Sequence, residues 1–429
     1  MSGVNASDVN PLTAKQPWDV VVIGGGIVGL STALELQSRA CKVALVDPDI
    51  ARARASFGNE GVISRSSIFT VPGPAIWGKA VSYLLNRDSA LRIRYRAFPY
   101  FARWLGHFIS CCTESHWRRS AKALNPFVGA AYAHHEQLAA SIGAAALVKR
   151  NGYLKLFRQQ RTFESTALER EMLADARIRV SIVRRGEIRD LEPSLADMFG
   201  HGLFFPDTGN VDSPDRLVDL YQEAFCKRGG ALIRGQARAI EPGPEAVTVH
   251  LDDGGSVQGK HAVVSAGVRS AGLVAPLGYR IPFTAERGYH LHFEMRPGAK
   301  LIRPIFDTEM NYGAAQMGDR IRILTGIELA RPDDSPDYTQ LRLAAQAARG
   351  VLPVGEAVGG SEWVGSRPST ADGLPVIGRA PHHPRLVFAF GHGHIGFSTG
   401  PVTGRIVAAL LADEPPPVPV GPFSVARFA

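Results

Sequence analysis

Cysteine is scarce in this sequence, and long apolar runs are missing. The four cysteines form no CxxC pair and have no histidine at metal-ligand spacing; they are Cys41, Cys111, Cys112 and Cys226. We therefore expect reduced thiols in a cytosolic protein. The first 16 residues lack the apolar core of a secretory signal, and no apolar run reaches the roughly 18 residues of a membrane span. These absences predict a chain that is soluble or at most peripheral to a membrane.

Other missing patterns exclude whole classes of chemistry. His134-His135 and His382-His383 are adjacent pairs without carboxylate or thiol partners at useful spacing, which predicts no metal site. The GxSxG turn of a Ser-His-Asp hydrolase is absent. No helix-turn-helix or zinc-finger pattern occurs, so we expect no nucleic-acid partner.

The sequence does contain a large apolar fraction and a small surplus of positive charge. Its 429 residues are 45% apolar and 21% charged, which is typical of a globular protein. The net charge of +8 favours anionic partners such as phosphates and carboxylates. The cations are densest between Arg92 and Arg119, among many aromatic residues. We favour amphipathic helices there, with the aromatics in the core; contact with membrane headgroups stays open.

A glycine-rich turn near the start of the chain predicts a phosphate-binding site. The run Asp19–Ile23 is typical of a strand buried on both faces, and Leu30 to Arg39 has the apolar spacing of a helix. Between them lies a GxGxxG pattern: Gly24, Gly26, Ile27, Val28 and Gly29. The first glycine permits the turn, the second admits a pyrophosphate, and the third lets helix and strand pack closely. The helix N-terminus then offers its N–H groups to the phosphates.

A second strand, Lys42–Val46, ends on Asp47 and completes a βαβ unit. The carboxylate is placed to accept hydrogen bonds from a ribose. This unit predicts a bound dinucleotide without separating NAD from FAD. The α/β pattern then returns from Gly209 to Gly267 and again from Val376 onward, so the nucleotide-binding half is interrupted twice by segments of different character.

Three further segments resemble one known family. Ala55–Ser64 (ASFGNEGVIS) resembles the flavin-contacting loop of the D-amino-acid oxidase and dehydrogenase superfamily. Val263–Val268 resembles the strand and turn that close its FAD domain, and Gly365–Gly378 with Phe390–Gly400 resembles its C-terminal signature. The likeness spans nearly the whole chain and is strongest to bacterial D-amino-acid dehydrogenases and their glycine-oxidase relatives.

The resemblance implies an α/β fold in which a discontinuous, Rossmann-like FAD-binding domain is interleaved with an α+β substrate domain built on an antiparallel sheet. We expect the FAD-binding domain over 17–85, 211–276 and 361–413, the substrate domain over 86–210 and 277–360, and polar or proline-rich tails over 1–16 and 414–429. Since no cysteine stands near Gly365–Arg367, where covalently flavinylated relatives carry their attachment thiol, noncovalent FAD is expected.

The resemblance also implies cofactor-binding residues beyond the glycine turn and Asp47. They are Ser56, Asn59, Gly61, Ala237, Ala266, Gly267, Gly393, His394, Ile395, Gly396 and Phe397. The last five form a loop leading into a helix, whose N-terminal N–H groups would stabilise negative charge at flavin N1 and the C2 carbonyl. Ala40 departs from the family pattern, where a glycine commonly ends the first helix, and Ala237 stands where a larger aliphatic is common.

Four residues are candidates for the chemistry itself. Arg367 matches the family position that binds the substrate carboxylate, which suits a guanidinium fork; a structural salt bridge beneath the flavin is the competing interpretation. Tyr289 and His290 resemble active-site positions of D-amino-acid dehydrogenases, although alternation from Tyr289 to Phe293 also fits ordinary core. We expect His290 or His394 to tune the proton of the substrate amine.

The leading hypothesis is an FAD enzyme that oxidises the Cα–N bond of a D-amino acid or a cyclic imino acid such as D-proline or its hydroxylated forms. Hydride would pass from Cα to flavin N5, and a quinone, an electron carrier or oxygen would accept the electrons. One alternative is a glycine- or sarcosine-type oxidase using oxygen, and another is a flavin-binding protein without turnover. We expect a cytoplasmic location, with contact to the inner membrane face as an open option.

Overall fold

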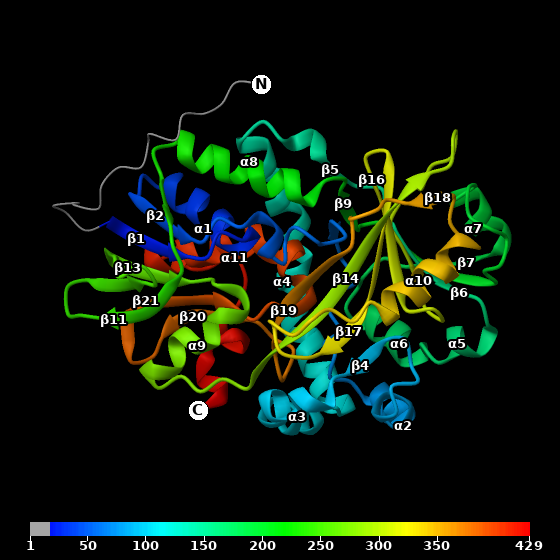
Figure 1. The fold of residues 1–429 in the computed structure, drawn as a ribbon, viewed down its shortest axis with the longest axis horizontal. Coiled ribbons are helices and arrows are strands. Elements are labelled where there is room, and N and C mark those ends of the chain that lie inside the picture. Colours follow the sequence, from blue (N-terminus) through cyan, green and yellow to red (C-terminus); the bar gives the residue numbers. More distant parts are fainter. Residues whose placement is uncertain (1–17) are drawn as a thin grey trace.

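The computed structural model describes residues 18–429, which form two large β-sheets with helices packed around them (Figure 1). One sheet is mostly parallel and the other largely antiparallel, so the α/β class with an antiparallel second sheet is confirmed. The tail predicted over 1–16, and residue 17 at the start of the predicted FAD-binding domain, lie outside the described residues.

The first sheet consists of β1 (Trp18–Ile23), β2 (Val43–Asp47), β10 (Ala231–Arg234), β11 (Ala237–Pro242), β12 (Val247–Leu251), β13 (Ser256–Val264), β20 (Val376–Ala380) and β21 (His383–Phe390). Its order is β10-β2-β1-β13-β12-β11, and β21 pairs with both β13 and β20. The strands β10, β2, β1, β13 and β21 are parallel neighbours. Strands β1 and β2 are apolar runs because both of their faces are covered.

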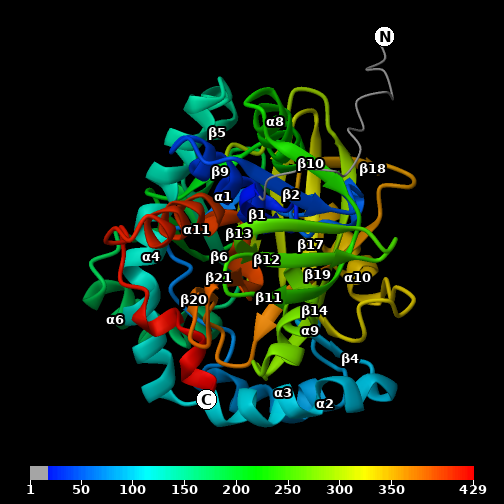
Figure 2. The same ribbon diagram turned by 90° about the vertical axis from the view of Figure 1, so that its left-hand side faces the viewer.

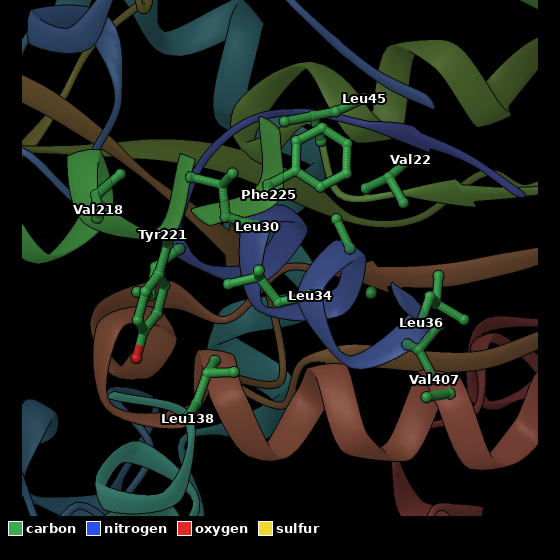
Figure 3. Close-up of a cluster of buried hydrophobic side chains, with 14 of the residues drawn as sticks. Val22, Leu30, Leu34, Leu36, Leu45, Leu138, Val218, Tyr221, Phe225 and Val407 are labelled. Carbon is green, nitrogen blue, oxygen red and sulfur yellow. The ribbon is translucent and has the colours of Figure 1, made fainter. Parts of the chain in front are cut away.

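Three helices cover one face of this sheet: α1 (Ile27–Gln37), α8 (Pro214–Lys227) and α11 (Gly396–Leu411). Figure 3 shows the buried cluster between them, in which Val22 and Leu45 from the strands meet Leu30 and Leu34 from α1 and Val407 from α11. The helix predicted from Leu30 begins three residues earlier, at the end of the glycine turn.

Glycines bring α1 and α11 unusually close. A Cβ atom on Gly404 would lie 2.7 Å from the backbone carbon of Ser31, and one on Gly400 would lie 2.9 Å from the Ile27 side chain. Only hydrogen fits at these positions. The close approach holds the N-termini of both helices beside the same ends of the parallel strands.

The second sheet consists of β4 (Leu91–Ile93), β6 (Tyr153–Phe157), β7 (Ser181–Arg184), β8 (His201–Phe205), β14 (Phe283–Met295), β15 (Ile305–Asp307), β16 (Tyr312–Met317), β17 (Arg320–Leu329), β18 (Val354–Ala357) and β19 (Trp363–Thr370). Its order is β18-β14-β17-β16-β15-β6-β8-β7, with β19 paired to β14 and β4 to β17. Helix α10 (Thr339–Arg349) packs its alanines and Leu341 onto one face.

The remaining elements lie around these two sheets. They are the small sheet of β3 (Val62–Ile63), β5 (Val148–Lys149) and β9 (Gly209–Val211), and the helices α2 (Ala80–Leu84), α3 (Phe98–Cys111), α4 (Glu114–Ser141), α5 (Gln160–Glu164), α6 (Ala167–Asp175), α7 (Arg185–Leu191) and α9 (Ser270–Val274). Figure 2 shows α2 and α3 along one edge of the molecule. None of the described helices is both long and apolar enough to cross a membrane.

The C-terminal segment is part of the fold rather than a free tail. Its prolines exclude an α-helix, as expected, and it forms two 3-10 turns, Gly421–Phe423 and Val425–Phe428. Phe423 is fully buried, and Arg427 makes an ion pair with Asp372 at 2.6 Å. The apolar side chains between the prolines explain this packing.

One predicted domain boundary needs a refinement. The range 361–413 was predicted for the FAD-binding domain, but it includes β19, which pairs along its full length with β14 of the second sheet. We propose that the last crossing between the two domains follows β19. The other predicted ranges stay proposals.

Candidate functional site

A cavity of about 660 Å³ lies between the two sheets. One wall is formed where parallel strands end, by Ile23, Asp47, Ser265 and Phe390, and the other wall comes from β14, β17 and β19. Ligands of open α/β sheets bind at the carboxyl ends of the strands. The volume lies within the roughly 300–1,000 Å³ of small-molecule sites.

The three glycines of the turn have separate physical roles. Gly24 has φ +109°, and a Cβ there would lie 2.4 Å from the carbonyl oxygen of Ser265. A Cβ on Gly29 would lie only 1.8 Å from the carbonyl oxygen of Gly24. At Gly26, which lines the cavity, the nearest protein atom would be 3.6 Å away, in Ser56. The first and third glycines are therefore required by the protein, whereas the second keeps space for a ligand.

The Asp47 carboxylate is fixed at the end of β2. Its Oδ2 accepts a hydrogen bond from the Gly25 N–H at 2.6 Å, and its Oδ1 accepts one from Arg54 Nη2 at 2.9 Å. Ser56 Oγ accepts a hydrogen bond from the Ile27 N–H at 3.1 Å. Because Arg54 is buried and also lines the cavity, it brings a positive charge beside the glycine turn.

Arg367 stands on the opposite wall. Its Nη1 donates a hydrogen bond to the Gly326 carbonyl at 3.0 Å, and its Nη2 lies over Gly288, where a Cβ would be 2.4 Å away. Nε and Nη2 have no hydrogen-bond partner among residues 18–429. Burial lowers the pKa of Arg367, while the carboxylates of Glu286 and Glu60 oppose that shift. A half-buried guanidinium with free donors in a cavity is suited to bind a carboxylate.

The two carboxyl groups near Arg367 are themselves perturbed. Burial raises the pKa of Glu60 to about 8, although Arg367 and Arg322 act in the opposite direction. Burial also raises the pKa of Glu286, which faces Arg367 across the β14–β19 pair. Arg367 has no ion pair within 4 Å in the described part of the chain, so a full structural salt bridge is not formed there.

Tyr289 lines the cavity but directs its hydroxyl away into a buried polar cluster. The hydroxyl donates to Glu328 and accepts a 3.1 Å hydrogen bond from the Asp337 N–H. Arg94 and Arg287 pair with the same Glu328, at 2.6 and 3.4 Å. Burial raises the pKa of Tyr289. Its ring packs in the same apolar cluster as Leu291 and Phe293, as the core interpretation expects.

His290 does not line the cavity. Its ring stacks on Trp363 with centroids 5.0 Å apart, and its Nδ1 lies 3.2 Å from the Gly58 carbonyl. Burial lowers its pKa to about 2, with a contribution from Arg322. His290 is therefore neutral and holds the loop Ala55–Ser64 against the second sheet.

His394 and the start of α11 form a third part of the cavity wall. The His394 side chain is exposed in the cavity, where partial desolvation and then the charge of Arg367 lower its pKa. Gly393, Gly396 and Phe397 line the cavity beside it, and α11 begins without a side-chain cap. The free N–H groups of this turn are available to a ligand.

A histidine from α4 completes the first turn of α11. Pro401 lies inside this helix and has no N–H to donate to the carbonyl four residues earlier, on Phe397. His135 Nε2 lies 2.8 Å from that carbonyl oxygen and is fully buried. Burial lowers the pKa of His135 to about 4. A neutral histidine thus replaces the missing backbone donor next to the cavity.

Most predicted site residues come together at this cavity. Those that line it are Gly24, Gly26, Ile27, Val28, Asp47, Ser56, Asn59, Ala237, Ala266, Gly267, Tyr289, Arg367, Gly393, His394, Gly396 and Phe397. Those that do not are Gly29, Gly61, His290 and Ile395, which pack behind the lining. Lining residues missed from the sequence include Arg54, Gln236, Trp363 and His392.

The arrangement fits a flavin dinucleotide. The N-terminus of α1, where Ser56 occupies only the Ile27 N–H, and a glycine that leaves room for phosphate lie at one end of the cavity, with Asp47 beside them. The uncapped start of α11 and the Arg367 guanidinium lie at the other end. No group of three or more His, Cys, Asp or Glu residues within 18–429 is arranged to hold a metal ion.

Comparisons with known proteins agree with this geometry. A model of the family described as "FAD dependent oxidoreductase" matches residues 19–410. The chain is 30% identical to a D-amino-acid oxidase of Bradyrhizobium diazoefficiens, over 95% of this chain and 98% of that protein. It is also 30% identical to D-amino acid dehydrogenase 2 of Pseudomonas aeruginosa, over 93% and 96%.

Two solved structures show the same fold. Glycine oxidase from Geobacillus kaustophilus matches with a TM-score of 0.75 at 20% identity, covering 96% of this chain and 99% of that one. L-proline dehydrogenase from P. horikoshii matches with a TM-score of 0.72 at 16% identity, covering 96% and 98%. At these identities the likeness concerns the fold alone.

Proposed function

The chain belongs to the family of FAD-dependent oxidoreductases, and from this premise we propose that it oxidises the Cα–N bond of a D-amino acid or a cyclic imino acid of the D-proline type. The observation that carries this proposal is Arg367, whose free guanidinium donors share one cavity with the dinucleotide-binding turn. A substrate held by its carboxylate would present Cα toward the cofactor.

We assign the binding of FAD to residues on the first wall. The glycine turn and the α1 N-terminus would hold the pyrophosphate, Asp47 would hold a ribose, and the N–H groups at the start of α11 would stabilise negative charge on the flavin. Bound FAD supplies the oxidant, because its N5 accepts a hydride from carbon. None of the four cysteines lines the cavity, which supports noncovalent binding.

On the substrate side, Arg367 fixes the carboxylate in two hydrogen bonds and so orients Cα. Glu328 and Asp337 hold Tyr289 in place, so this tyrosine acts as a wall of the substrate pocket. His394 is exposed in the cavity and its pKa is lowered, so its imidazole can accept a hydrogen bond from the substrate amine. His290 is a positioning residue that supports the loop at Gly58.

The product is an imine, which water hydrolyses to a 2-oxo acid or which persists as a cyclic imine when the substrate is a ring. Glu60 and Glu286 are buried close to Arg367 but do not line the cavity, so they influence the substrate through Arg367 rather than by direct contact.

The test is anaerobic bleaching of the purified yellow protein. D-proline, hydroxy-D-proline and D-alanine are expected to remove the oxidised flavin absorbance, with the L-isomers as matched controls. Glycine and sarcosine test the alternative of a glycine-type oxidase, and peroxide formation in air against dye or quinone reduction identifies the acceptor. Failure of every amine to bleach a flavin-loaded protein would favour the non-catalytic alternative. The cytoplasmic location stays a prediction.

A further inference from the structure

Figure 2 shows α2 and α3 of the segment 74–111, which also contains β4, along one edge of the molecule. This segment exposes many large apolar side chains. Eight of the 13 exposed large apolar residues of the described chain lie in it: Trp77, Val81, Leu84, Leu85, Tyr95, Phe98, Tyr100 and Ile109. Their exposed fractions reach 71% at Val81 and 60% at Leu84. Scattered exposed apolar residues are normal, but such a concentration marks an interaction surface.

The apolar side of helix α3 extends beyond the part that packs on the protein. Its inner face carries Phe101, Trp104 and Phe108, which are buried against Leu329. Phe98 and Ile109 are apolar as well, yet nearly half of each is exposed. Phe98 packs edge-on against Phe101, with ring centroids 5.7 Å apart, so the exposed apolar side chains widen the inner face. The apolar side of α3 is therefore broader than the part that the described chain covers.

The charge of the same segment indicates the partner. Between residues 74 and 111 there are six Lys or Arg residues and one acidic residue, Asp88. Arg87, Arg96 and Arg103 are exposed and have no ion pair among residues 18–429. A dense mixture of tryptophan, tyrosine, aliphatic residues and unpaired cations matches the headgroup region of an anionic bilayer.

The surface is joined to the border of the cavity. Arg92 pairs with Asp337 at 3.2 Å, and Arg94 reaches both Glu328, at 2.6 Å, and the Ser335 carbonyl, at 3.0 Å. Ser335 and Asp337 lie in the loop between β17 and α10, which also contributes Pro332 and Asp333 to the cavity lining. Whatever covers the surface therefore lies next to the cavity entrance on this side.

We propose that the surface formed by segment 74–111 docks on a bilayer containing anionic phospholipids. The apolar side chains enter the interface while the surrounding cations contact lipid phosphates. The protein binds the membrane from one side, with α2 and α3 against the lipid and the cavity border facing the same interface. Docking in this way would place the cavity within reach of a lipid-soluble electron acceptor.

Co-sedimentation of the flavin-loaded protein with vesicles tests the proposal. We expect binding to vesicles of equal parts phosphatidylglycerol and phosphatidylcholine, weakened by added salt, and little binding to pure phosphatidylcholine. The double variant Val81→Asp with Leu84→Asp should reduce binding more than tenfold. Its matched control, Ile182→Asp with Leu343→Asp, changes residues that are 51% and 52% exposed elsewhere and should bind like the wild type.

The electrostatic part has its own variant pair. Arg96→Glu is expected to weaken binding about tenfold, whereas Arg238→Glu, at an exposed position in β11, should not. Flavin content and far-ultraviolet circular dichroism show whether each variant is folded. Wild-type protein that ignores anionic vesicles, or a control pair that binds as poorly as the test pair, would overturn the proposal. The proposal would also be overturned if sedimentation showed a dimer of the wild type that the Val81/Leu84 variant loses and the control pair keeps. The surface would then contact a second copy of the chain.

Discussion

Replacing Arg367 with alanine is expected to lower kcat/KM for the amino acid about 150-fold, mainly through KM. The structure leaves Nε and Nη2 of this guanidinium without a partner among the described residues, while Nη1 is held by Gly326. A hydrogen bond to a charged group contributes roughly 1.5–3 kcal/mol. We use the lower value for both bonds, because Arg367 is only half-buried and water can partly replace the lost carboxylate. Two bonds then give about 3 kcal/mol, or about 150-fold.

A conservative variant and a substrate without a carboxylate separate the loss of the carboxylate contacts from a general disturbance of the fold. Arg367→Lys keeps a point charge but loses the fork, so about a tenfold loss is expected. With an amine that has no carboxylate, such as pyrrolidine in place of D-proline, the wild type and Arg367→Ala should react at similar rates. The assay is anaerobic stopped-flow reduction of the flavin as substrate concentration varies, with flavin content measured for each variant.

Equal KM values for wild type and Arg367→Ala would refute the carboxylate clamp. An equal loss with D-proline and with pyrrolidine would do so as well, since the loss would then reflect a disturbed fold. The structural alternative predicts that second result, because Arg367 also packs over Gly288 and ties β19 to the turn at Gly326.

Three further predictions follow from contacts in the first sheet and its helices. Gly26→Ala should leave the melting temperature of the flavin-free protein unchanged but weaken FAD binding strongly. Gly29→Ala should fold poorly, because its methyl group would meet the Gly24 carbonyl. Calorimetry measures the stability of the two variants and flavin titration measures their affinity for FAD. His135→Phe should lower stability by about 1–3 kcal/mol by leaving a buried carbonyl unpaired, and adding Pro401→Ala, which restores a backbone N–H, should recover part of it in urea unfolding. His135 stays neutral down to about pH 4 in the folded protein, whereas in the unfolded chain it is protonated below about pH 6.5. The free energy of unfolding therefore falls as the pH drops from about 6.5 to about 4. His135→Gln should reduce this slope by about 1.4 kcal/mol per pH unit, and an unchanged slope would contradict the assigned protonation state.

The parts of the site that depend on local geometry could be predicted from the sequence. The glycine turn, the strand before it and Asp47 are close in the chain, and their roles follow from backbone sterics. The structure places Ile23 at the end of that strand, Gly24, Gly26 and Asp47 in the lining of one cavity, with Gly29 behind them. Arg367 and His394 required the family resemblance, because nothing near them in the sequence indicates which cavity they enter.

The parts that depend on contacts between distant segments could not be predicted. Alternation in β14 places Tyr289 and His290 on opposite faces of the strand but does not show which face meets the first domain. We expected His290 at the reaction centre, whereas its ring stacks on Trp363. Arg54 lies in an irregular loop, where no periodicity signals that it pairs with Asp47. The exposure of Phe98 is likewise a property of the assembled surface.

The strand order of the first sheet has a consequence for how the protein is made. Strand β1 and helix α1 leave the ribosome long before β13, β21 and α11, yet β1 must pair with β13, β13 with β21, and α1 must pack on α11. The apolar faces of α1 therefore stay uncovered during most of synthesis, and contacts of such large sequence separation form slowly. We expect folding to finish only after release, so that chaperone supply and flavin availability at that moment, more than translation speed, determine the yield of active protein.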